Sequence, residues 1–139
     1  MIKVEHLTKK YGERYAVNDI SFEVKKGEIV GFLGPNGAGK STTMNILTGY
    51  LSSTSGRAMI DGLDILEHPM AVKKKIGFLP EMPPLYLEMT VKEYLNFIYD
   101  LKKCTLNRRE HIAEICRVVK IEDTMNRMIK NLSKGYRQR

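Results

Sequence analysis

The sequence predicts an α/β fold in which a parallel sheet, flanked by helices, carries a phosphate-binding loop. Residues 34–41 read Gly-Pro-Asn-Gly-Ala-Gly-Lys-Ser, the glycine-rich pattern ending in lysine and serine that builds such a loop. Residues 28–33 before it are a nearly continuous apolar run, typical of a strand buried on both faces. Residues 42–48 after it have a helical pattern that Gly49 ends. Strand, loop and helix therefore occur in the order that phosphate binding requires.

The N-terminal region predicts an antiparallel β layer ahead of this core. Residues 2–5 and 20–24 alternate between apolar and polar side chains, as half-buried strands do. Residues 57–60 form a further expected strand, which Asp61 and Gly62 end as a turn pair. We expect the strands at 2–5 and 20–24 to form an antiparallel layer that precedes the core.

The middle of the chain predicts one more helix and one more buried strand. Pro69 is expected to begin a short helix that runs to Lys75, and residues 76–79 form an apolar run that stops at Pro80. The prolines within residues 81–86 prevent regular structure, so this segment is expected to be a loop.

The C-terminal third has a helical pattern. Thr90 and Glu93 have the spacing of a capping box, and Asn107 and Glu110 repeat it. Two apolar stripes at three- and four-residue spacing follow these pairs, formed by Val91, Tyr94, Leu95, Ile98 and Leu101 and by Ile112, Ile115, Cys116 and Val119. We expect the two helices to pack together, which divides the chain into a β layer and loop-containing core (1–86) and a helical subdomain (87–139).

The loop residues explain how a polyphosphate would be held. Backbone N–H groups must turn inward, and side chains at Gly34, Gly37 or Gly39 would obstruct them or forbid the backbone angles. Lys40 would place its ammonium against the β- and γ-phosphates, and Ser41 would offer a hydroxyl to Mg²⁺. The expected nucleotide contacts in this segment are Asn36, Gly37, Ala38, Gly39, Lys40, Ser41 and Thr42.

Composition and charge limit which other functions the chain can have. The 139 residues carry a formal charge of +7, which suits nucleic acid, an anionic surface or polyphosphate. The basic residues form separate short clusters typical of solvated helix faces, so no nucleic-acid partner is expected. The two cysteines lack metal-site spacing and predict buried thiols in a reducing compartment. Without a secretory signal or a long apolar run, the chain is expected to be cytoplasmic.

The whole chain resembles the nucleotide-binding domain of ATP-binding cassette (ABC) transporters. Besides the loop, three segments carry the resemblance: Leu-Thr-Lys-Lys-Tyr-Gly at 7–12, Ile-Gly-Phe-Leu-Pro-Glu at 76–81, and Leu-Ser-Lys-Gly-Tyr at 132–136. The last is similar to the family signature Leu-Ser-Gly-Gly-Gln. The resemblance implies a P-loop NTPase core, ATP and Mg²⁺ as cofactors, and ATP hydrolysis coupled to transport.

The resemblance also implies roles for residues outside the loop. Tyr11 matches the aromatic residue that stacks on adenine, and Val17 would add an apolar contact. Glu81 stands where the family usually has glutamine, so with Lys40 it becomes a catalytic candidate and with Ser41 a ligand of Mg²⁺.

The signature segment implies a partnership between two copies of the domain. Ser133 and Gly135 would close over the γ-phosphate of a nucleotide held by a second nucleotide-binding domain, arranged head to tail. Lys134 and Tyr136 replace the commoner glycine and glutamine of the signature. Transmembrane permease subunits would dock at residues 81–86, which places the protein on the cytoplasmic face of a membrane.

Two alternatives to a transporter subunit remain at this point. One is a soluble cassette ATPase acting on nucleic acid or the ribosome, and the other is a nucleotide-binding fragment without hydrolysis. The family pattern continues with an apolar strand ending in Asp-Glu, the Walker B strand, and a later histidine, whereas the sequence ends at Arg139 before both. We therefore expect this chain by itself to bind nucleotide, to hydrolyse it slowly and to be weakly stable.

Overall fold

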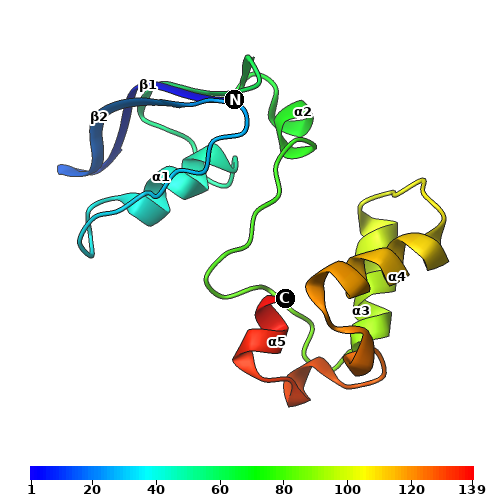
Figure 1. Ribbon diagram of the computed structural model, residues 1–139. Helices are drawn as coiled ribbons and strands as arrows, with labels where there is room; N and C mark the ends of the chain where they lie inside the picture. Colours follow the sequence, from blue (N-terminus) through cyan, green and yellow to red (C-terminus); the bar gives the residue numbers. More distant parts are fainter. The chain divides into compact units, whose positions relative to one another are not determined.

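The computed structural model describes residues 1–139 as two compact units, Met1–Phe78 and Leu79–Arg139 (Figure 1). The division lies earlier than the boundary expected after residue 86. Segment 79–86 belongs to the second unit, and its Leu85 packs against the core of that unit. The two units are described separately below.

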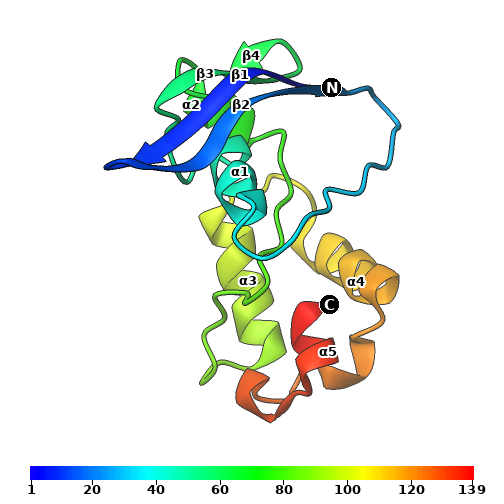
Figure 2. The same cartoon turned by 90° about the vertical axis from the view of Figure 1, so that its left-hand side faces the viewer.

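The first unit contains the expected antiparallel layer. Its four-stranded sheet has the order β2-β1-β3-β4, and every neighbouring pair is antiparallel (Figure 2). The strands are β1 (Ile2–Tyr11), β2 (Arg14–Val24), β3 (Ser55–Ile60) and β4 (Leu63–Asp64). The β1–β2 hairpin extends well beyond the two short strands expected from alternation, because cross-strand hydrogen bonds continue to the Tyr11–Arg14 pair at its tip.

Turn residues appear where the sequence predicts them. Asp61 and Gly62, with φ of 48° and 78°, connect β3 to β4, and two successive positive φ angles suit a tight hairpin. Gly49 follows helix α1 (Lys40–Leu47) with φ of 68° and donates its N–H to the carbonyl of Ile46. Both predicted turns are therefore confirmed.

The core of the first unit lies between the sheet and α1 (Figure 2). Helix α2 (Pro69–Lys73) adds one buried side chain to it, and Pro69 begins that helix as expected. The buried apolar residues are Val4, Leu7, Ile46, Leu47, Ala58, Ile60, Ile65 and Val72. Because this core packs the helix against the hairpin, it fixes the segment that precedes the helix, which is the glycine-rich loop.

Two predicted strands are not formed. Residues 28–33 and 76–79, expected as buried strands of a parallel sheet, have no regular secondary structure. Ile29 is fully exposed, and Leu33 is 92% exposed. The physical reason is that a strand needs a neighbour for its backbone hydrogen bonds, and the sheet pairs only β1 to β4. The apolar runs thus indicate a tendency to form strands, but no neighbouring strand pairs with them in this structure.

The second unit is helical, as expected (Figure 1). Its elements are the helices α3 (Val91–Leu101), α4 (Arg108–Val119) and α5 (Lys134–Gln138), with the short 3₁₀ helices η1 (Glu122–Thr124) and η2 (Ile129–Asn131). Its buried apolar residues are Val91, Ile112, Cys116, Ile121, Ile129 and Leu132. No helix in either unit is both long enough and apolar enough to cross a bilayer.

The starts of α3 and α4 follow the predicted capping pairs. Thr90 accepts a hydrogen bond from the Glu93 N–H, and the Glu93 carboxylate accepts one from the Thr90 N–H, which completes the capping box. These hydrogen bonds lower the pKa of Glu93. Asn107 caps α4 by accepting from the Glu110 N–H. Cys116 is a buried thiol, as expected, and burial raises its pKa.

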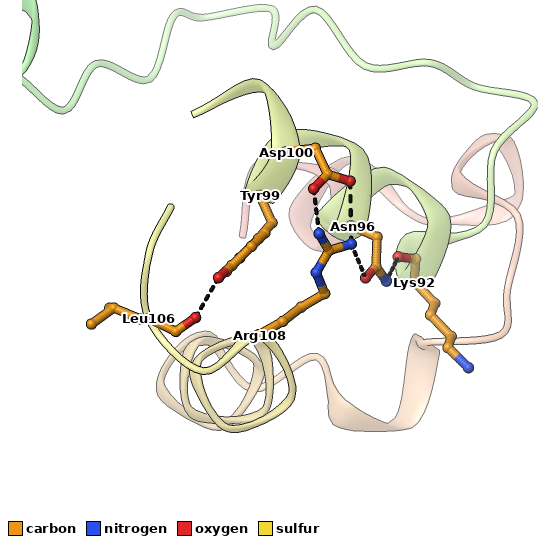
Figure 3. Close-up of polar contacts among 6 residues, drawn as sticks. All are labelled: Lys92, Asn96, Tyr99, Asp100, Leu106 and Arg108. Atoms are coloured by element: carbon orange, nitrogen blue, oxygen red, sulfur yellow. Dashed lines mark hydrogen bonds and ion pairs between the residues drawn. The ribbon is translucent and has the colours of Figure 1, made fainter. Parts of the chain in front are cut away.

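A group of polar contacts joins the end of α3 to the start of α4 (Figure 3). The Arg108 guanidinium donates to both carboxylate oxygens of Asp100 and lies 4.5 Å from the centroid of the Tyr99 ring. The Tyr99 hydroxyl donates to the Leu106 carbonyl in the connecting loop. The Arg108 guanidinium thus links α4 to α3 through both Asp100 and the Tyr99 ring.

We expect Arg108→Ala to destabilise the second unit by about 1 kcal/mol, because it removes a two-pronged ion pair and a cation–π contact on a solvated surface. The neighbouring Arg109→Ala is the matched control, because Arg109 makes no ion pair. Urea unfolding followed by circular dichroism measures both. Equal midpoints for the two variants would contradict the role given to Arg108.

Candidate phosphate-binding site

The glycine-rich loop is pressed against strand β2. Gly39 is the residue before α1 and has a left-handed conformation, with φ of 91°. A Cβ built on it would lie 2.2 Å from the Ala16 carbonyl oxygen and 3.2 Å from Val17 Cγ2. Both the conformation and the space therefore require glycine at this position. The loop receives its shape from β2 at this point.

The first turn of α1 leaves its N–H groups free. No side chain caps the helix, and Thr43 is the first residue whose N–H bonds within it, to the Gly39 carbonyl at 2.8 Å. The N–H groups of Lys40, Ser41 and Thr42 have no partner in the chain. Such groups, together with the helix dipole, bind anions. The structure therefore fits the phosphate role predicted for this segment.

The Lys40 ammonium lies within the loop that precedes it. Its Nζ donates to the carbonyl oxygens of Gly34, at 2.5 Å, and Pro35, at 2.7 Å. The ammonium is thus held within the loop by two carbonyl oxygens, and an entering anion would replace them as its partners. The other predicted loop contacts differ in exposure. Four are exposed, namely Asn36, Gly37, Ala38 and Ser41, and Thr42 is half-buried.

A cavity of about 380 Å³ opens between β2 and the loop. This volume lies in the range typical of small-molecule sites. Its lining residues are Tyr15, Ala16, Val17, Asn18, Ile20, Phe32, Gly37, Ala38 and Thr43. Three predicted contacts, Val17, Gly37 and Ala38, border the cavity, so the loop and β2 form its walls together.

Tyr11 does not line this cavity. It lies at the end of β1 opposite Arg14, with its side chain 52% exposed. The sequence analysis missed the other six lining residues, among them Tyr15, Phe32 and Thr43. The available signal for Tyr15 was its place two residues before Val17, because alternate residues of a strand share a face.

The remaining predicted site residues belong to the second unit. Glu81 is exposed and makes no hydrogen bond or ion pair. Ser133 caps α5 by accepting from the Tyr136 N–H at 3.3 Å. A Cβ on Gly135 would meet only Ser133 Oγ, at 4.0 Å, so the chain itself leaves room for a side chain there. The predicted site is thus divided between the two units.

A profile of the family described as ABC transporter matches residues 17–139. The chain belongs to the ABC transporter family. It is 33% identical over 139 residues to the bacitracin transport ATP-binding protein BcrA of Bacillus licheniformis, covering 100% of this chain and 45% of BcrA. It thus spans less than half the length of this ABC relative.

Solved ABC structures share the fold. An ATP-binding subunit of an ABC transporter superposes with a TM-score of 0.84 at 28% identity, covering 99% of this chain and 58% of that one. The dimeric bacterial ABC cassette MJ0796 gives 0.82 at 29%, covering 97% and 64%. The structure therefore has the P-loop NTPase fold of ABC ATPase domains, in the part that the chain spans, and the predicted fold class is confirmed.

We expect Gly39→Ala to destabilise the first unit by more than about 1 kcal/mol, because the new Cβ meets a backbone oxygen that cannot move aside and the backbone angle disfavours alanine. Gly37→Ala is the matched control, since Gly37 also has a positive φ, of 82°, but open space around it. Thermal unfolding compares the two. A Gly37 variant as unstable as the Gly39 variant would show that the contact with β2 is unimportant.

Proposed function

We propose that this chain is the ATP-binding part of an ABC transporter subunit and that its loop binds the phosphates of Mg-ATP. The observation that supports this most strongly is the convergence at one loop of three free N–H groups and the Lys40 ammonium. A relative named as a transport ATP-binding protein and a cassette solved with ADP and phosphate support the same function.

In this proposal each group of the first unit has a separate task. Lys40 exchanges its two carbonyl partners for oxygens of the β- and γ-phosphates. The N–H groups of the first turn of α1 contact the same phosphates, and the exposed Ser41 hydroxyl would ligate Mg²⁺. When bound, Mg²⁺ neutralises phosphate charge during phosphoryl transfer. Tyr11 and Val17 would contact the base and ribose from the hairpin.

The second unit would serve a nucleotide bound by another copy. The space around Gly135 supports this, because nothing in the chain itself requires glycine there. Absence of a side chain beside the Ser133 hydroxyl would let a phosphate approach the backbone. The MJ0796 cassette is described as dimeric, which fits closure between two copies. We propose that Ser133 and Gly135 contact the γ-phosphate in such a dimer.

Hydrolysis and coupling would involve the segment around Glu81. An exposed carboxylate without a partner is free to ligate Mg²⁺ or orient the attacking water, as the resemblance implies for this position. Met82 is 86% exposed and Tyr86 is 56% exposed, which offers apolar area to permease subunits. We propose that ATP hydrolysis, with Lys40 and Glu81 as catalytic residues, drives transport from the cytoplasmic face of a membrane.

Titration with Mg-ATP tests the nucleotide site. We expect Lys40→Ala to weaken binding roughly 10- to 100-fold, the effect of losing a hydrogen bond between charged groups. Lys26→Ala is the matched control, because this exposed lysine lies outside the loop and should leave the dissociation constant unchanged. Isothermal titration calorimetry measures all three proteins. Equal affinities for the wild type and the Lys40 variant would contradict the proposed site.

A further inference from the structure

The side chain of Lys9 is held between a carbonyl oxygen and an aromatic ring. Its Nζ donates to the Ser52 carbonyl at 2.8 Å and lies 5.2 Å from the centroid of the Tyr11 ring. Ser52 follows α1 in the chain, so this one ammonium joins the hairpin to the segment that leaves the helix. Its position over the ring is thereby set by a hydrogen bond as well as by the cation–π attraction.

Strand register places this pair on the hairpin face that meets the loop. Lys9 and Tyr11 are two residues apart on β1, and alternate residues of a strand share a face. Lys9 lies opposite Val17, and directly opposed residues of an antiparallel pair also share a face. Val17 in turn lies beside Gly39. The ring of Tyr11 therefore belongs to the same face as the contact that shapes the phosphate loop.

The neighbouring lysine forms a similar pair with a tyrosine that lines the cavity. Lys10 lies opposite Tyr15, and its Nζ is 5.2 Å from the centroid of that ring. Ala16 is the extra residue in β2 that shifts the register between the two pairs. The hairpin thus carries two lysine–tyrosine pairs of equal spacing, of which the Lys9 pair lies opposite Val17 and the Lys10 pair includes Tyr15 of the cavity wall.

We propose that Lys9 is a positioning residue for Tyr11, which it holds with one ring face covered by the ammonium and the other presented to the base of the bound nucleotide. The inference rests on the proposed nucleotide site. The Tyr11 side chain is 52% exposed and would otherwise sample several rotamers. Fixing it before binding removes an ordering cost that corresponds to roughly a 2- to 10-fold gain in affinity.

The alternative is that Lys9 only fastens the segment after α1 to the sheet. Two probes separate these roles, because Mg-ATP has a base and Mg-tripolyphosphate has none. A residue that positions a stacking ring affects the first probe alone. A residue that merely maintains the loop affects both, because both depend on the same N–H groups.

The experiment measures the affinities of Mg-ATP and Mg-tripolyphosphate for the wild type and for the variants Lys9→Met and Lys26→Met, which retain the aliphatic stems. We expect Lys9→Met to weaken Mg-ATP binding roughly 2- to 10-fold and to leave tripolyphosphate binding unchanged. Lys26→Met should change neither affinity, because this exposed lysine lies outside the loop and the hairpin pairs. Lys9→Arg, which keeps a cation over the ring, should recover most of the loss.

A Tyr11→Ala background completes the test. There Lys9→Met should cause no further loss, because the ring that it positions is gone. Undiminished Mg-ATP affinity in Lys9→Met, an equal loss for both probes, or an additive loss in the double variant would each overturn the inference. A wild type that binds neither probe would instead contradict the proposed nucleotide site, and the role of Lys9 would fall with it.

Discussion

The contact between Gly39 and the backbone of β2 is the constraint on which the site depends. A hydrogen atom is the only substituent that fits beside the Ala16 carbonyl, so the loop can approach the sheet only through this glycine. That approach fits the left-handed turn before α1, and the N–H groups of its first turn stay without partners because no side chain caps the helix. The cavity between the loop and β2 has the same origin, because the two elements that contact each other at Gly39 also form its walls.

The positive charge at the site comes from the placement of individual lysines rather than from the net charge of the chain. The chain carries an excess of seven positive charges, yet most of its lysines and arginines lie on solvated surfaces. Lys40 differs because two carbonyl oxygens hold its ammonium at the loop before any ligand arrives. Lys9 differs in a similar way through Ser52 and the Tyr11 ring. A cation already held in place loses less freedom when its ligand binds.

Local signals predicted much of this fold. The loop, the capping box at Thr90, the turn at Asp61 and the β1–β2 hairpin all depend on residues close in sequence, and the structure contains each of them. The strands expected at 28–33 and 76–79 depend on neighbours far along the chain, which an apolar run does not reveal.

The most direct test of this account is the response of individual backbone amides to Mg-ATP, followed by NMR. We predict that the N–H groups of Lys40, Ser41 and Thr42, free in the structure, shift most and gain protection from exchange on titration. Saturation with nucleotide that leaves these three amides unchanged while others respond would contradict the central claim that they hold the phosphates.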